Sequence, residues 1–233
     1  MVMNTNDLLT QYATGERQFQ KADLNGVSLY RAELKAIVLT EANLIGANFS
    51  GASLSGADLS QANLIGANLS GADLRTVNLN SATLIGANLG GAKLGAANLA
   101  KITLNGANLS AANLSEANFK AASLARANLA GAVLSHVNLQ GADLSGTNLS
   151  YASLVDADLS RANLEGANLV GANLSNAILQ NASLTNANLR GASLQGSDLS
   201  FANLSGANWP EEHWPEAIVN GTTLPNSKPA SSR

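Results

Sequence analysis

Few residues in this sequence could do acid–base or metal chemistry. There are two histidines, His136 and His213, and no cysteine, which excludes a disulfide framework and a thiol nucleophile. His213 lies among Glu211, Glu212 and Glu216, a combination of residue types that metal sites use. Carboxylates around a single histidine are more commonly solvated residues at the start of a helix. We therefore expect no catalytic residue, no metal and no cofactor. A metal-dependent activity at the C-terminal end is the third hypothesis for the function of this chain, after the two that the repeat and the charge balance suggest below.

The composition indicates a repetitive protein rather than an ordinary globular domain. Hydrophobic residues make up 45% of the 233 positions, but only 4% are aromatic and 12% are charged. Disordered chains are rich in charge and poor in leucine, so they do not fit. No basic segment followed by an apolar run opens the chain, and no run of 18 apolar residues occurs. We expect a cytoplasmic protein without a membrane-spanning helix.

A five-residue repeat runs through most of the chain. From Phe19 to Trp209, all 39 residues spaced by five are Leu, Phe or Trp, and we call each of them a centre. Two places before the centre, 31 of 38 residues are Ala, and one place before it, 25 of 38 are Asn or Asp. Two places after the centre lie 17 of the 21 glycines.

A period of five fits neither a helix nor a straight strand. On a helix the leucines would spiral around the axis, and in a strand they would alternate between faces. They share one interior only if the chain turns once in every repeat, with the centre and the preceding Ala inside. Glycine two places after the centre suits the positive φ of a type II turn. Because Lys21, Arg31 and Glu41 occupy the same position, we expect some turns to be of another type.

The repeat resembles that of the pentapeptide-repeat family over residues 19–209. Its complete copies read Ala-Asn/Asp-Leu-x-Gly, as at Ala67–Gly71 and Ala142–Gly146. The resemblance implies an all-β fold, a right-handed four-sided β-helix with 20 residues in each coil. The segment Leu-Ile-Gly-Ala-Asn, which begins at positions 44, 64 and 84, independently favours a 20-residue coil.

An open solenoid needs a cap at each end, and both ends depart from the repeat. Residues 1–18 form the lead-in, and within them Asn6–Gly15 is predicted to be a capping helix with Asn6 as N-cap and Gly15 as terminator. Its apolar face is expected to consist of Leu8, Leu9, Tyr12 and Ala13. Residues 210–224 are predicted to cap the other end, and residues 225–233 to form a disordered tail. The residues expected to plug the last coil are Trp209, Trp214, Ile218 and Val219.

The charge balance bears on possible partners. Residues 17–209 contain 11 basic and 11 acidic side chains, so the net charge of the rod is 11 − 11 = 0. Direct nucleic-acid binding requires a basic stripe, which this balance does not favour. Some members of the family mimic DNA and bind DNA gyrase by means of a strongly acidic surface and loops that interrupt the repeats. This chain has the repeats but neither the acidic surface nor the loops. Binding to gyrase, with inhibition or protection of the enzyme, is therefore the alternative hypothesis and not the first.

One outward column could contact a partner. With 20 residues in each coil, Ile45, Ile65 and Ile85 stack next to glycines that include Gly46, Gly66 and Gly86. One interpretation is a β-branched ladder that stabilises local stacking, and the other is a contact strip for a partner or a second copy. We predict a non-catalytic scaffold or interaction rod, monomeric or weakly dimeric, with an unidentified protein partner.

Overall fold

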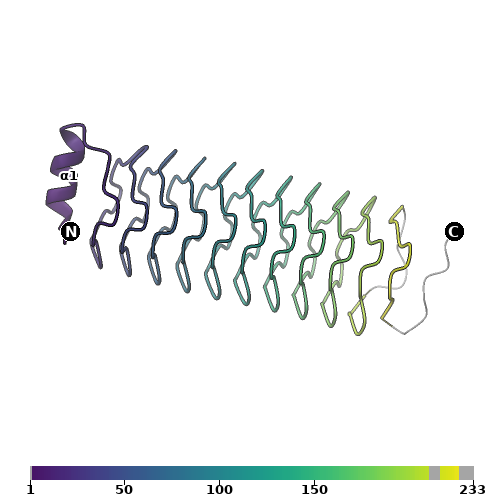
Figure 1. The fold of residues 1–233 in the computed structure, drawn as a ribbon. Coiled ribbons are helices and arrows are strands. Elements are labelled where there is room, and N and C mark those ends of the chain that lie inside the picture. The colour runs from purple at the N-terminus through teal and green to yellow at the C-terminus, as the bar shows by residue number, and fades with distance from the viewer. Residues whose placement is uncertain (1, 210–215, 226–233) are drawn as a thin grey trace.

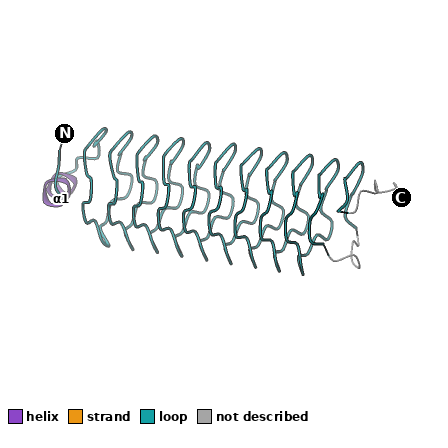
Figure 2. Cartoon of the chain, turned by 90° about the horizontal axis from the view of Figure 1, so that it is seen from below, coloured by secondary structure: helices purple, strands orange, loops and turns teal. Residues whose placement is uncertain are grey.

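The computed structural model describes residues 2–209 and 216–225, which form a rod of stacked coils (Figure 1). From Gln18–Val38 to Asn203–Thr223, every parallel bridge between coils joins residues 20 positions apart. One coil therefore contains four five-residue repeats, as the spacing of the Leu-Ile-Gly-Ala-Asn segments predicted. Helix α1 (Thr5–Ala13) lies at one end of the rod and residues 216–225 lie at the other (Figures 1 and 2).

Backbone hydrogen bonds join each coil to the next in a repeating pattern. In the repeat centred on Leu64, the Leu64 N–H donates to the carbonyl of Thr83 at 2.7 Å, and the Gly66 N–H donates to that of Ile85 at 3.0 Å. The Ala67 N–H closes the turn on the Leu64 carbonyl at 3.0 Å. The all-β fold that the resemblance implied contains no regular strand in the described residues. Over the described residues the coils pair through isolated bridges, because a turn interrupts the extended backbone in every repeat.

The interior consists of the two positions that the repeat predicted. The centres and the residues two places before them are buried almost throughout and form one continuous hydrophobic core. Where Thr147 and Ser197 replace Ala, each hydroxyl donates at 2.7 Å to the carbonyl of the preceding centre. The buried hydroxyls are therefore satisfied, as burial requires.

One turn position has the same backbone conformation at φ throughout the repeats. Residues two places after the centre have positive φ at every position from Lys21 to Gly206, whether or not they are glycine. The φ of Lys21 is 57°, that of Arg31 is 52° and that of Glu41 is 57°. All of these residues therefore have the positive φ that a type II turn requires at this position. The ladders to the next coil hold this backbone conformation at a cost of about 1 kcal/mol for each non-glycine residue.

Helix α1 begins at Thr5, two residues before Asp7, which would be the first helical residue if Asn6 were the N-cap. Its N-cap is Asn4, whose Oδ1 accepts from the Asp7 N–H at 2.9 Å, while the Asp7 carboxylate accepts from the Asn4 N–H. Only Asp7 at the third helical position completes this reciprocal box, which explains the choice of Asn4 over Asn6. Gly15 follows the helix with a φ of 103°, as a helix terminator requires.

The helix lies against the first coil. Leu8 is fully buried in the core, and Leu9 and Tyr12 are partly buried against it, but Ala13 is exposed, so its place on the apolar face was predicted wrongly. The Tyr12 hydroxyl donates to the carbonyl of Lys35 at 2.9 Å, which ties the helix to the coil.

At the other end, residues 216–225 continue the repeat. Ile218 bridges to Asp198 and Thr223 bridges to Asn203, again 20 positions apart. Val219 and Leu224 continue the five-residue spacing that begins at Phe19, a continuation that the change of composition after Trp209 obscured. Val219 and Trp209 pack against the core, but Ile218 is 46% exposed and does not plug the last coil. Trp214, His213, Glu211 and Glu212 and the predicted tail from Asn226 onward lie outside the described residues.

Candidate partner-contact surfaces

The isoleucine column exists as an exposed strip. Ile45, Ile65 and Ile85 are 36%, 37% and 42% exposed, and they occupy the same turn position of three successive coils. Beside them Gly46, Gly66 and Gly86 have φ values of 63–65°, and a Cβ added at any of them would meet no atom within 4 Å. The apolar side chains are therefore flanked by open backbone. We call these six residues the isoleucine strip.

The backbone of the strip is rigid, and its surroundings are uncharged. The carbonyls of Ile45 and Ile65 accept from glycine N–H groups of the preceding coil, both at 2.9 Å. On this side of the rod, no charged residue occurs at the outward positions between Asp23 and Arg126. A partner that covers the strip would therefore desolvate no charge and would order little backbone.

A second outward feature, a ladder of asparagine amides, was not predicted. Every residue one place before the centre along one bridge column, from Asn48 to Asn208, is Asn. The Asn108 Nδ2 donates to the Asn88 Oδ1 at 3.0 Å, and the Asn128 Nδ2 donates to the Asn108 Oδ1 at 3.2 Å. We call this column the asparagine ladder. The signal was present in the frequency of Asn before the centre, but only the coil length shows which amides stack.

The ladder amides from Asn48 to Asn188 also serve their own turns. The Asn108 Oδ1 accepts from the backbone N–H of Ser110 at 3.2 Å, and Asn48 does the same for Ser50 at 3.0 Å. The backbone bonds between coils give that N–H no carbonyl acceptor. The asparagine side chain therefore completes the hydrogen bonding of the repeat. The turn residues beside the ladder, from Ser50 to Gly171, include no charged side chain. The amides therefore have a clear structural role.

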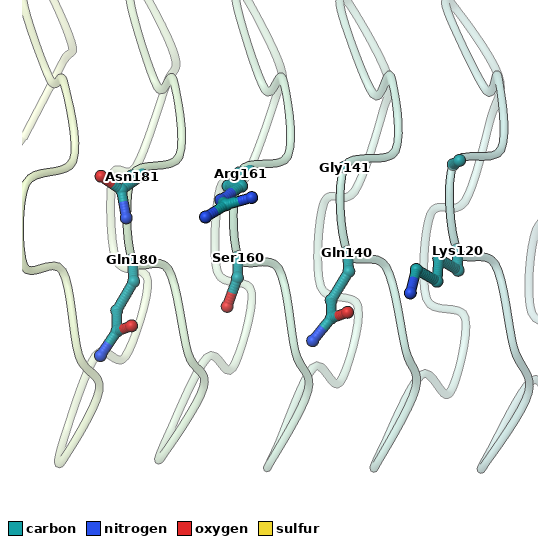
Figure 3. Close-up of a pocket in the computed structure, with 8 residues that line it drawn as sticks. Lys120, Gln140, Gly141, Ser160, Arg161, Gln180 and Asn181 are labelled. Carbon is teal, nitrogen blue, oxygen red and sulfur yellow. The ribbon is translucent and has the colours of Figure 1, made fainter.

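A shallow groove of about 460 Å³ crosses four successive coils on another side (Figure 3). It is lined by Lys120, Ala121, Gln140, Gly141, Ser160, Arg161, Gln180 and Asn181. The Gln140 Nε2 donates to the Asp158 carboxylate at 2.5 Å, and the Ser160 hydroxyl donates to the same group at 2.6 Å. Partial burial raises the pKa of Asp158, but the hydrogen bonds from Ser160 and Gln140 outweigh it and hold the pKa below its usual range.

The described residues contain no group of three or more His, Asp or Glu side chains that could hold a metal ion. His136 is exposed at a turn, and its Nδ1 lies 3.8 Å from an oxygen of Asp156 in the next coil. This is a surface contact between two turn residues, with no nucleophile positioned by it. Among the residues that the structure places, no helix is long and apolar enough to cross a membrane.

The fold is thus a β-helical solenoid of five-residue repeats. The pattern of pentapeptide repeats matches the chain in eight copies within residues 18–208. The chain belongs to the pentapeptide-repeat family, whose solved members imply a right-handed β-helix.

Several solved structures are similar to this chain. HetL, a pentapeptide repeat protein involved in heterocyst differentiation regulation from the cyanobacterium Nostoc sp. strain PCC 7120, is 34% identical, with 98% of this chain and 100% of HetL covered and a TM-score of 0.64. Rfr23 from the cyanobacterium Cyanothece 51142 is 38% identical over 43% of this chain and 63% of its own, with a TM-score of 0.34. Full-length QnrB1, a plasmid-mediated fluoroquinolone resistance protein, is 18% identical over 83% of this chain and 94% of its own, with a TM-score of 0.44. No curated protein matches the sequence.

Proposed function

We propose that this chain is a non-catalytic interaction rod, a capped four-sided β-helix that binds a protein partner through the isoleucine strip. The observation that carries the proposal is the strip itself, in which three exposed isoleucines stand on a rigid, uncharged part of the rod. The four bridge columns per coil and the packing of Leu8 over the first coil support the four-sided, capped architecture. The proposed role requires no cofactor, and its setting is the cytoplasm.

The likeness to HetL supports a regulatory role. The two chains share 34% of their residues over nearly their whole lengths, and HetL is involved in the regulation of heterocyst differentiation. A rod that regulates without catalysis acts by occupying a surface of another protein. We therefore propose a regulatory partner that presents an apolar, uncharged surface to the strip.

The test replaces the strip with charge. Ile45→Lys, Ile65→Lys and Ile85→Lys, combined in one variant, place three ammonium groups where the partner must remove water. The matched control carries Ala125→Lys, Ser145→Lys and Thr185→Lys, which occupy the same turn position of the same column further along the rod. Both variants should remain folded, because all six side chains point outward.

The measurement is retention of partner proteins by the immobilised rod from extracts of the source cells, with sedimentation velocity of the rod alone. We expect the strip variant to lose a protein that the wild type and the control both retain. Loss of self-association in the strip variant alone would identify the partner as a second copy. Equal retention by all three rods, together with unchanged sedimentation, would reject the strip as a contact surface.

The alternative, a DNA mimic that binds gyrase, lacks a supporting surface. The 11 acidic and 11 basic side chains of residues 17–209 balance, whereas mimicry of DNA requires an excess of negative charge. We expect DNA supercoiling by gyrase to be unaffected by the rod, with or without a quinolone. Inhibition or protection in that assay would replace the present proposal.

A further inference from the structure

Three Asn-Gly sequences occur in the chain, Asn25-Gly26, Asn105-Gly106 and Asn220-Gly221. In such a pair the glycine amide nitrogen can attack the side-chain carbonyl carbon of the asparagine. The new C–N bond forms as ammonia leaves, which gives a cyclic imide. Water then opens the ring to aspartate or isoaspartate, so water is the only co-reactant. Glycine favours the attack because it has no side chain to obstruct it.

All three pairs occupy equivalent turn positions. Gly26, Gly106 and Gly221 have nearly equal φ values of 67°, 66° and 67°. Local backbone conformation at the glycine therefore does not distinguish them. Any difference in their reactivity has to arise from the neighbouring coils.

Two of the pairs are protected by the following coil. The Gly26 N–H donates to the Ile45 carbonyl at 2.9 Å, and the Gly106 N–H donates to the Ala125 carbonyl at 3.0 Å. Each bond directs the glycine nitrogen along the rod axis and must break before the nitrogen can attack. Breaking it also requires two packed coils to separate, which costs most at Gly106 because that residue lies in the middle of the solenoid.

Asn105 has a second restraint. The Ser123 hydroxyl donates to its Oδ1 at 2.6 Å, which fixes the side chain against the next coil. Asn105 must therefore lose one backbone and one side-chain hydrogen bond before it cyclises, whereas Asn25 must lose only the backbone bond. Asn105 should therefore cyclise more slowly than Asn25.

Asn220-Gly221 lies on the last described coil. Within residues 2–209 and 216–225, the Gly221 N–H donates no hydrogen bond, although the Asn220 carbonyl accepts from the Phe201 N–H at 2.8 Å. The only described coil that holds this pair is the preceding one, so the nitrogen is not directed away from the asparagine side chain. Among the described residues this coil packs on a single other coil, and a coil held on one side opens at lower cost than one held on both.

We propose that Asn220 is a site of spontaneous deamidation and isoaspartate formation, and that the stacked coils suppress the same reaction at Asn25 and most strongly at Asn105. Conversion to isoaspartate inserts a methylene group into the backbone next to Gly221. The Phe201 ring packs against Gly221, where an added Cβ would lie 2.7 Å from the ring. Modification therefore loosens the last coil at the place where Phe201 holds it.

The experiment follows all three sites in the full chain. The folded protein is incubated at neutral to mildly basic pH, and peptides are analysed over time by mass spectrometry with an isoaspartyl methyltransferase assay. We expect Asn220 to react at least about tenfold faster than Asn25, with Asn105 slowest, which corresponds to a difference in opening cost of about 1.4 kcal/mol or more. Asn220→Gln should abolish the methyltransferase signal at early times.

The control repeats the incubation in concentrated urea. There the three sites should react at similar rates, since their local sequences share the Asn-Gly pair and the coils no longer exist. Equal rates in the folded protein, or no reaction at Asn220, would overturn the proposal. So would a difference among the sites that survives unfolding, because it would come from sequence and not from stacking.

Discussion

Leu64 and Ile65 are neighbours in the chain but belong to opposite regions of the rod. Leu64 is fully buried in the interior, and Ile65 is 37% exposed in the isoleucine strip. The interior repeats the same two residue types in coil after coil, whereas the outward positions vary along each column. The comparison teaches that the interior specifies the solenoid and that any individual role lies in the outward columns.

The largest expected effect is on the interior side of this comparison. Leu109→Ala in the middle of the rod should lower the free energy of unfolding by about 2–5 kcal/mol, because it opens a cavity between stacked coils. Chemical denaturation measures the loss. Ser110→Ala, one residue further on and outward, is the control and should change stability far less. Equal losses in the two variants would contradict the division of the rod into interior and exterior.

The asparagine ladder is the outward column whose removal should matter most. Asn108→Ala removes the acceptor for the Ser110 N–H and two amide bonds along the ladder, so we expect a loss of about 1–3 kcal/mol in denaturation. The control is Asn113→Ala. Asn113 accepts from the Ser115 N–H at 3.1 Å and, in an exposed bond, from the Ser115 hydroxyl at 2.9 Å, but its column neighbours, Lys93 and Val133, are not asparagine. A loss at Asn113 as large as that at Asn108 would show that the ladder bonds contribute nothing.

The turn glycines give a smaller and graded effect. Gly66→Ala introduces a Cβ into open space at positive φ and should cost about 1 kcal/mol, since only the backbone conformation opposes it. Gly171→Ala should cost more, because the new Cβ would lie 2.6 Å from the Tyr151 ring. Thermal unfolding of both variants, with Gly171→Ala repeated in a Tyr151→Ala background, measures the difference. If the second substitution fails to reduce the cost at Gly171, the ring contact is not its cause.

The smallest expected effect is the pH dependence from Asp158. The hydrogen bonds that hold its pKa below the usual range stabilise the folded state above the unfolded pKa. This contribution should disappear as the pH falls through the depressed folded pKa. Asp158→Asn should flatten the acid limb of a stability–pH curve slightly. An acid limb that becomes steeper would contradict the sign of the shift.

Much of this architecture was predictable because the physics of a five-residue period leaves few alternatives. Leu and Ala every fifth position predict the interior, and the spacing of the Leu-Ile-Gly-Ala-Asn segments predicts the coil. The positive φ of Lys21 was not predictable, since its value of 57° opposes local preference and is held by the next coil. The N-cap was misplaced because Asn4 and Asn6 are both good caps, and only Asp7 distinguishes them.

The candidate site was predictable only in part. The positions of Ile45, Ile65 and Ile85 follow from the coil length, but their exposure and the rigidity of the backbone beneath them required coordinates. The groove along Gln140 and Ser160 depends on side-chain conformations that the repeat does not encode. The last coil was hidden because Val219 replaces leucine at a centre beyond an interruption in composition.

The most direct test of the division between interior and surface compares Leu64→Ala with Ile65→Lys in two assays, denaturation and partner retention. Leu64→Ala should lower the free energy of unfolding by about 2–5 kcal/mol and, below its melting temperature, still retain the partner. Ile65→Lys should keep its stability within about 0.5 kcal/mol and weaken retention. The opposite pair of results, stability lost at Ile65 and retention lost at Leu64, would contradict the account.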